Sequence, residues 1–163
     1  MLQPDWADLR GTLGGSEDYA SRTLAQIERI IIHHVGPPGG NRDYSAREIA
    51  DYHVKSLKWP GIGYHFLAHP DGRLDYVGDI LTVRYHAGLL NPSSVGVCLA
   101  GDFSVEEPTA AQLATVRALC SWLPVEIGRV LPVVGHRDVS HLTGYGFTEC
   151  PGDTWPQWKS QVA

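Results

Sequence analysis

Apolar positions along the chain recur in two different periods, and each period predicts its own kind of element. Three isoleucines in succession open residues 30–35, where β-branched residues follow one another without polar alternation, so this run predicts a buried central strand. Four further runs predict strands at 64–69, 73–78, 95–103 and 130–135. The Pro70-Asp71-Gly72 segment between the first two of these predicts a hairpin.

Helical spacing of apolar residues predicts four helices that alternate with these strands. A first helix is expected over residues 16–27. The capping box from Ser45 to Glu48 opens a second, which runs through about Lys58 and ends at the Trp59-Pro60-Gly61 segment. A third begins near residue 108 and ends before Pro124, and a short fourth covers 155–162.

The alternation of strands and helices predicts an α/β fold, a mixed central β-sheet of about five strands flanked by helices. A chain of 163 residues with 43% hydrophobic content suffices for one core, so we expect a single domain over residues 1–163. Residues 1–15 are polar and dotted with glycine, and they predict an irregular N-terminal arm.

Charge and composition narrow the classes of partner. The net charge is −5, and the thirteen basic residues are spread singly, so no basic stripe is available for nucleic acid. No apolar run approaches the roughly 20 residues that a membrane-spanning helix needs, so we expect no membrane insertion. The first residues lack the pattern of a signal peptide, so we expect synthesis in the cytoplasm. We also expect the protein to be a monomer. Cys98 and Cys120 lie in apolar stretches and are predicted to be buried free thiols.

Candidate chemistry gathers at two histidine motifs and one cysteine. His136 follows the predicted strand 130–135, and Cys150 stands fourteen positions later in a loop. With one of the neighbours His33 and His34, they supply two imidazoles and a thiolate, which suit Zn²⁺ and leave a fourth position for water, as in catalytic zinc sites. Neighbouring residues on a strand point to opposite faces, so at most one of the two can join the site, and periodicity does not choose between them.

The other histidines have weaker claims. His65 and His69 have the spacing of a zinc pair on a helix, but their segment predicts a strand and no glutamate follows His65. We expect His53 to pack on a helix face, His141 to be exposed, and His86 to line a pocket. The glycine-rich residues 36–41 lack the Lys-Ser/Thr ending of a phosphate-binding loop and are expected to shape a rim.

Short motifs between residues 27 and 158 carry a family resemblance. They are Ile31-Ile32-His33-His34, Gly63-Tyr64-His65-Phe66, Asp71-Gly72, His86-Ala87-Gly88, Asn91 with residues 94–99, Gly135-His136-Arg137-Asp138 and Cys150-Pro151-Gly152-Asp153. In this order and spacing they resemble the zinc-dependent N-acetylmuramoyl-L-alanine amidases of type 2. That family includes amidase-type phage lysozymes and the animal peptidoglycan recognition proteins.

The resemblance implies a ligand set and a reaction. It selects His33 over His34 and implies that His33, His136 and Cys150 bind Zn²⁺. The implied reaction is hydrolysis of the amide bond between N-acetylmuramic acid and L-alanine in peptidoglycan. It further implies a phage or prophage endolysin. The missing signal-peptide pattern fits holin-type release to the cell wall if the source is a phage, and it fits equally well a domain cut from a longer polypeptide.

The resemblance also implies roles around the metal. Tyr64 is expected to stabilise the tetrahedral intermediate. Thr148 stands where the phage branch carries a lysine, and its neutral hydroxyl is expected to contribute less. His86 and Asn91 are expected to contact glycan or stem peptide, whereas Asp138 would either orient a ligand histidine or pair with a nearby arginine.

Two other functions remain open at this point. Some recognition proteins of this fold only bind peptidoglycan, so a non-catalytic binding module is the first alternative, and the retained ligands argue against it. A cysteine hydrolase that uses Cys150 and His136 is the second, and it would need a reactive thiolate rather than a metal.

Overall fold

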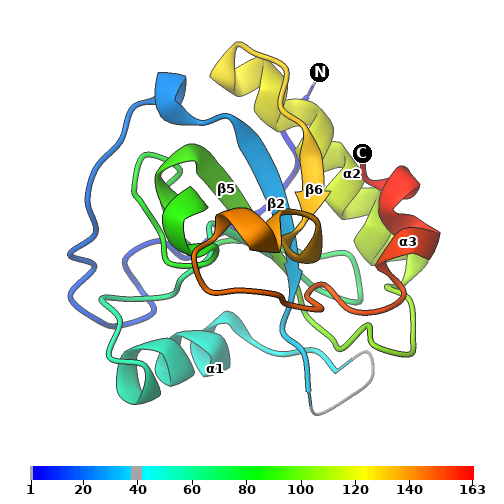
Figure 1. Ribbon diagram of the computed structural model, residues 1–163. Coiled ribbons are helices and arrows are strands. Elements are labelled where there is room, and N and C mark those ends of the chain that lie inside the picture. The colour runs from blue at the N-terminus through cyan, green and yellow to red at the C-terminus, as the bar shows by residue number, and fades with distance from the viewer. Residues whose placement is uncertain (1, 38–41) are drawn as a thin grey trace.

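Six strands form one mixed sheet in the computed structural model, which describes residues 2–37 and 42–163 (Figure 1). The strands are β1 Ala7–Asp8, β2 Arg29–His34, β3 Phe66–Ala68, β4 Leu74–Tyr76, β5 Ser94–Leu99 and β6 Val133–Gly135. They lie in the order β1-β4-β3-β5-β2-β6. The β3–β4 pair is antiparallel, and the other neighbouring pairs are parallel.

Helices lie between and around these strands. The α-helices are α1 Ala46–Asp51, α2 Ala110–Ile127 and α3 Trp155–Trp158. A π-helical turn, Tyr52–Ser56, continues α1, and short 3-10 helices cover Leu24–Gln26, Gly88–Ser93, His136–Leu142 and Lys159–Gln161. The fold prediction is therefore confirmed, with one strand more than the five expected. None of the helices within the described residues has both the length and the apolar character needed to cross a membrane.

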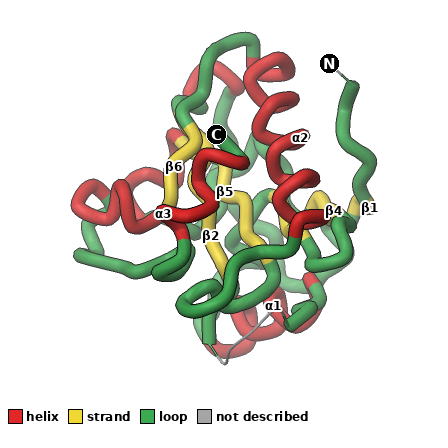
Figure 2. Tube along the Cα trace, turned by 90° about the vertical axis from the view of Figure 1, so that its right-hand side faces the viewer, coloured by secondary structure: helices red, strands yellow, loops and turns green. Residues whose placement is uncertain are grey.

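The sheet separates two apolar clusters because successive side chains of a strand point to opposite faces, and β2, expected to be central, lies fifth of the six strands. Ile30 and Ile32 face a large cluster that includes residues of α2 and both tryptophans of α3. The opposite face of the sheet contributes Leu67 and Cys98 to a smaller cluster with residues of α1. Figures 1 and 2 both place α1 below the strands and α2 beside and above them.

The helix expected over residues 16–27 is wrong. Only Leu24–Gln26 are helical, and Ser21 instead forms a β-bridge with Thr82. The reason is the long-range bonding of Arg22, which is buried and donates hydrogen bonds to the carbonyl groups of Ile80 and Ser94. These contacts outweigh the weak helical preference of the segment.

The N-terminal arm is less irregular than predicted. Residues 7–8 add β1 to the edge of the sheet beside β4, and Trp6 packs its ring against Phe66, Tyr76 and Trp122. The burial of this aromatic side chain fastens the arm to the domain.

Several predicted boundaries shift by a few residues. The second strand of the hairpin and its partner are three residues each, and β5 ends at Leu99 rather than at residue 103. α2 passes through Pro124 to Ile127, because Ile127 packs against the large cluster, and it ends at Gly128, whose φ of 79° suits glycine. Cys98 and Cys120 are buried free thiols, as predicted. The rim expected at residues 36–41 lies mostly in 38–41, outside the described residues.

Candidate metal centre

Two parallel strands bring the candidate histidines to the same edge of the sheet. β2 and β6 pair with Ile32 opposite Gly135, so His33 and His136 are the next residues along each strand direction. The carboxyl ends of parallel strands meet at one edge, where open α/β sheets place their ligands. The ring centroids of His33 and His136 lie 4.7 Å apart.

Cys150 reaches this edge on a loop that Arg137 holds in place. The backbone N–H of Arg137 donates to the Cys150 carbonyl at 2.6 Å. The guanidinium of Arg137 donates to the Gly152 carbonyl and to the Asp153 carboxylate, each at 3.1 Å. The residue that follows one candidate ligand thus fixes the turn that carries another, an arrangement that the sequence analysis missed.

The three side chains form a cluster of ligand atoms. One ligand atom from each of His33, His136 and Cys150 lies within 4.8 Å of the others, and no other such group of histidine, cysteine and acidic residues occurs in the described part of the chain. The Sγ of Cys150 lies 3.6 Å from Nδ1 of His33. Zinc bonds of about 2.3 Å to sulfur and about 2.05 Å to nitrogen, at a tetrahedral angle, place two such ligands about 3.5 Å apart. The residues therefore fit a tetrahedral zinc ion.

The two neighbouring histidines on β2 have different environments. His33 points toward Cys150 and is almost fully buried. On the other face, His34 accepts a hydrogen bond from the N–H of Phe103 through Nδ1, and this nitrogen lies 3.7 Å from Asp102. The geometry brings His33, and not His34, into the cluster.

Burial keeps the cluster neutral when no metal is present. It lowers the pKa of His33 well below the usual 6.5, with a further contribution from His136, and it also lowers the pKa of His136. Burial raises the pKa of the Cys150 thiol to about 12. Neutral imidazoles are what a metal requires, whereas the thiol has to exchange its proton for the metal ion.

Tyr64 and Thr148 lie beside the cluster. The ring of Tyr64 is 5.3 Å from that of His33, and its hydroxyl shares a hydrogen bond with the thiol of Cys98. Burial raises the pKa of Tyr64 well above its usual 10.0, with the thiols of Cys98 and Cys150 adding to the effect, so the phenol stays protonated. The Oγ1 of Thr148 accepts a hydrogen bond from the Cys150 N–H at 3.2 Å.

His86 and Asn91 are engaged within the protein. His86 is buried, and its Nδ1 lies 3.0 Å from Nε2 of His33. Asn91 accepts hydrogen bonds through Oδ1 from the N–H groups of His86 and Ala87, at 3.0 and 2.7 Å. Both side chains also line the cavity next to the cluster, so their contact with glycan or stem peptide stays a prediction.

Asp138 takes neither of the roles considered from the sequence. Its Oδ2 accepts hydrogen bonds from the N–H of Gly135 at 2.9 Å and from Nε1 of Trp155 at 2.7 Å. It thus ties the end of β6 to α3. The arginine beside it in sequence, Arg137, pairs with Asp153 instead.

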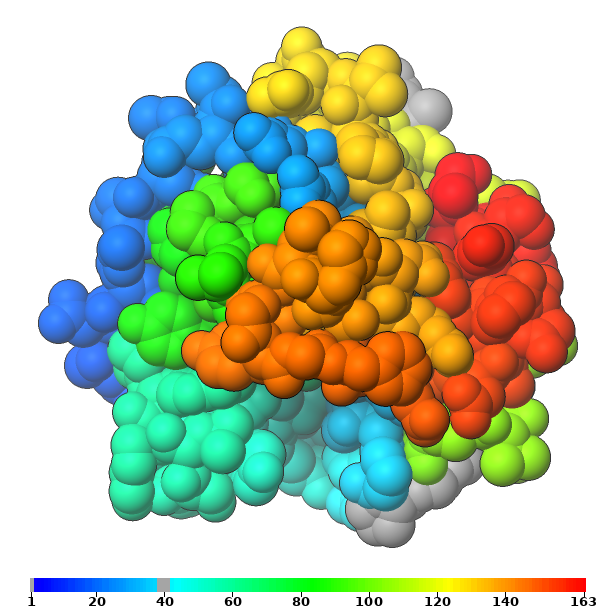
Figure 3. All heavy atoms as spheres, viewed as in Figure 1, coloured from blue at the N-terminus to red at the C-terminus, as the bar shows by residue number. Residues whose placement is uncertain are grey.

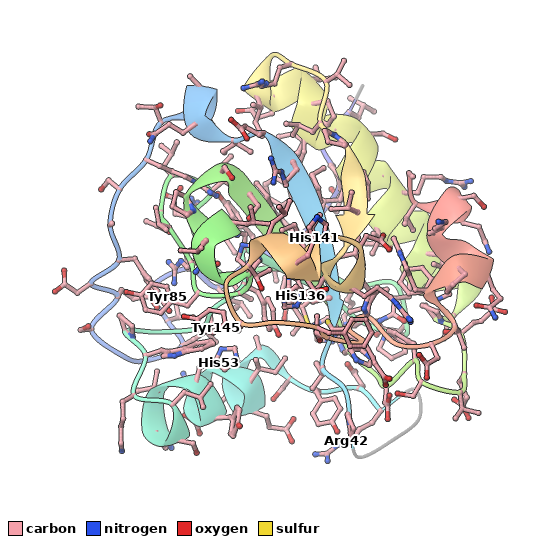
Figure 4. The ribbon with its side chains drawn as sticks, in the orientation of Figure 1. Arg42, His53, Tyr85, His136, His141 and Tyr145 are labelled. Atoms are coloured by element: carbon pink, nitrogen blue, oxygen red, sulfur yellow. The ribbon has the colours of Figure 1, made fainter. Side chains whose placement is uncertain are left out.

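Two cavities, each of about 460 Å³, flank the cluster. Four aromatic side chains line the first together with His136 and Thr148: Trp59, Tyr85, Tyr145 and Phe147. Tyr64, His53, Tyr44 and Glu48 are among the residues that line the second. Figure 3 shows the surface hollowed between the orange segment around residues 142–148 and the teal segment that includes α1. In Figure 4, His53, Tyr85, His136 and Tyr145 gather in this region.

The remaining histidines lie outside the cluster. His53 is buried and accepts a hydrogen bond from the N–H of Gly63, in agreement with a packing role. His65 lies against Arg22, and His69 lies between Asp43 and Asp75, so these two do not form a metal pair. His141 is exposed, as expected.

Comparison with known proteins gives one consistent family. A family model described as N-acetylmuramoyl-L-alanine amidase matches residues 23–153. The peptidoglycan-recognition protein SC2 of Drosophila simulans is 34% identical over 163 residues, which cover 90% of this chain and 84% of that protein. The endolysin of Klebsiella phage KP32 is 34% identical over 142 residues, which cover 83% and 88%. The structure of Drosophila PGRP-LB matches with a TM-score of 0.75 at 25% identity, covering 91% of this chain and 89% of that one.

Proposed function

This chain belongs to the N-acetylmuramoyl-L-alanine amidase family, and from this premise we propose that it hydrolyses the amide bond between N-acetylmuramic acid and L-alanine in peptidoglycan. His33, His136 and Cys150 would hold the Zn²⁺ ion for this reaction. The observation that carries the proposal is the convergence of these three ligand atoms beside two cavities, at a spacing that suits zinc.

The protein's own groups supply most of the positioning. A zinc ion held by these ligands would polarise the scissile carbonyl and lower the pKa of water from about 15.7 to about 7. Tyr64, whose raised pKa keeps its proton in place, donates a hydrogen bond to the oxygen on which negative charge develops. The Oγ1 of Thr148 accepts a hydrogen bond from the Cys150 N–H, which leaves its hydroxyl hydrogen free to donate, but a neutral hydroxyl stabilises an oxyanion less than an ammonium group would, so its contribution is the smaller one.

The two cavities match a substrate that extends to both sides of the scissile bond. A glycan strand and a peptide stem meet at the amide that is cleaved, so an amidase needs room on each side of its reactive centre. Aromatic walls such as Tyr145 and Phe147 offer broad apolar contact, and they are 86% and 73% exposed. The net charge of −5 gives no general attraction to an anionic wall polymer, so recognition depends on these shaped surfaces.

The protonation state of Cys150 disfavours a cysteine hydrolase. Burial raises the pKa of Cys150 to about 12, whereas a catalytic thiol needs a lowered pKa to act as a nucleophile. The binding module without catalysis is distinguished by experiment, because it would leave the wall polymer intact. We further propose that the protein acts on the cell wall as an endolysin, in keeping with its similarity to phage endolysins.

Mass spectrometry of digested cell walls tests the proposal. Purified protein is incubated with peptidoglycan, and the products are expected to show N-acetylmuramic acid separated from L-alanine, with new L-alanine amino groups. A chelator should stop the reaction and added zinc should restore it. If the muropeptides stay intact in the presence of stoichiometric zinc, the protein is not an amidase, and the non-catalytic binding module is the function that remains.

Two histidine variants provide the matched comparison. His33→Ala removes a proposed ligand and is expected to abolish cleavage. His141→Ala removes an exposed histidine from the segment that also carries His136, and it should leave cleavage unchanged. Full activity in His33→Ala would refute the ligand assignment.

A further inference from the structure

A second histidine, His86, stands directly behind His33 on the side away from Cys150. Its Nδ1 is 3.0 Å from Nε2 of His33, and the two rings are nearly perpendicular, with an interplanar angle of 88°. The other nitrogen of His33, Nδ1, lies 3.6 Å from the Cys150 sulfur. His33 thus has one nitrogen toward the cluster and the other toward His86.

The direction of this hydrogen bond follows from its continuation through Ser94. The Ser94 hydroxyl donates its one hydrogen to the Leu90 carbonyl at 2.7 Å. Toward Nε2 of His86, 3.4 Å away, it can therefore only accept. This contact places the proton of His86 on Nε2.

The tautomer of His33 is then determined. A neutral imidazole carries one ring proton, so Nδ1 of His86 is bare and accepts from Nε2–H of His33. Nδ1 of His33 is bare in turn, and its lone pair points into the cluster. The opposite tautomer would place a hydrogen where a metal has to bind.

The backbone around His86 fixes the position of its ring. A Cβ atom on Gly96 would stand 2.7 Å from Cγ and 2.8 Å from Nδ1 of His86, so the ring lies flat on β5 where only glycine leaves room. Asn91 holds the His86 N–H at 3.0 Å. The ring therefore has little freedom to turn away from His33.

We propose that His86 is a positioning residue that holds His33 in the tautomer and orientation needed to bind the metal. Ser94 sets the direction of the hydrogen bonds that link Ser94, His86 and His33. The inference rests on the metal site of the proposed function and concerns how that site is prepared. His86 makes no contact with the metal ion in this role. By accepting the hydrogen bond from Nε2–H of His33, His86 makes the other nitrogen of His33 a stronger ligand.

Zinc affinity of two His86 variants tests the proposal. In His86→Leu no acceptor remains for His33, and the Kd for zinc, measured by competition with a chelator, is expected to rise about 10- to 100-fold. In His86→Asn the amide oxygen can replace Nδ1 as the acceptor, so the Kd should stay within about threefold of wild type. A Leu variant that binds zinc as tightly as wild type would overturn the proposal.

A control separates positioning from general loss of packing. His53→Leu alters a histidine that is equally buried but bonds to the Gly63 N–H, and it should lower the melting temperature without changing the Kd for zinc. If His86→Leu does not fold, Ser94→Ala serves in its place, and we expect a smaller rise in Kd. An unchanged zinc Kd in folded Ser94→Ala would then count against the proposed series of hydrogen bonds from Ser94 through His86 to His33.

Long-range ¹H–¹⁵N NMR of the wild-type protein gives a readout that does not depend on catalysis. Both His33 and His86 are expected to carry their protons on Nε2. A proton on Nδ1 of His86 would overturn the proposal even if the protein cleaves peptidoglycan. Conversely, a protein with the expected tautomers and zinc affinities that leaves peptidoglycan intact would refute the proposed function and not this inference.

Discussion

Two groups of buried histidine in this molecule are built in opposite ways. At the edge formed by β2 and β6, His33 lies beside His136 and His86, and burial lowers the pKa of all three. At the hairpin turn after β3, His69 lies between two carboxylates. Its Nδ1 forms a hydrogen bond with Asp43 at 2.5 Å, and its Nε2 forms one with Asp75 at 3.0 Å. Burial lowers the pKa of His69, but the two carboxylates outweigh it and the pKa is raised.

The difference shows what burial does with and without a counter-charge. Without a carboxylate, a buried imidazole stays neutral, and the lone pair of its unprotonated nitrogen is available to a metal. With two carboxylates, it becomes a cation that joins distant segments, here the residues before α1 and strand β4. The first group is therefore suited to metal binding and the second to stabilising the fold, and we expect that each can be perturbed without the other.

Removal of the thiolate ligand should have the largest effect. Cys150→Ala is expected to reduce bound zinc from about one ion per chain to almost none and to abolish cleavage, because two imidazoles alone hold zinc weakly. Metal analysis after dialysis and the cell-wall assay measure both. Cys120→Ala removes another buried thiol, from α2, and should keep both zinc and activity. Loss of zinc in the Cys120 variant would show that the assay reports folding.

Tyr64→Phe should separate catalysis from metal binding. The variant retains the ring but not the hydroxyl proposed to stabilise the developing charge, so turnover is expected to fall about 100- to 1,000-fold. Zinc content should not change, since Tyr64 is not one of the clustered ligands. An undiminished rate would remove this tyrosine from the mechanism.

His69→Gln should give the opposite result, a loss of stability with no loss of zinc. Hydrogen bonds to a charged group contribute about 1.5–3 kcal/mol each. Because Asp43 is partly exposed to solvent, we expect the unfolding free energy to decrease by an amount near the lower end of this range. Urea unfolding measures this change. If the zinc Kd rose as well, the two histidine groups would be coupled, and the comparison would fail.

The two groups should also respond to pH with opposite sign, a smaller effect. The raised pKa of His69 stabilises the fold fully below about pH 6.5, and this contribution is lost as pH rises through the folded-state pKa. The lowered pKa values of His33 and His136 act in reverse, so the metal-free protein loses stability as pH falls below about 6.5.

Urea unfolding of metal-free wild type and His69→Gln between about pH 5 and 9 measures both effects. The difference between the two proteins should be greatest at the acid end and should shrink toward the alkaline end. A difference that stays constant with pH would mean that His69 is not charged in the folded protein.

Local signals in the sequence were sufficient for the main elements. The isoleucine run of β2 and the capping box before α1 are each determined by neighbours along the chain, and both predictions hold. The helix expected over residues 16–27 failed because the bonds of Arg22 go to residues 58 and 72 positions away. No local pattern contains such partners.

The candidate site shows the same limit. The residue types of the ligand set were visible in the motifs, but the choice between His33 and His34 depends on which face of β2 turns toward the loop at Cys150. The positions of His86 and Arg137 depend on pairs 53 and 13 residues apart in the chain. The contact of His86 with Gly96 also joins residues that are not neighbours in the sequence, so only the packing reveals it.

The bond between Arg137 and Cys150 has a consequence for how this protein can diversify. It closes the base of the loop 139–148, so the candidate ligands on either side of this loop, His136 and Cys150, are held together whatever the loop's tip contains. Loop closure costs little more free energy as a loop lengthens, so the exposed tip 144–147, between the buried Thr143 and the half-buried Thr148, can accept insertions or new side chains. Exchange of Tyr145 and Phe147 by directed evolution should thus retune substrate range while the reactive centre remains assembled.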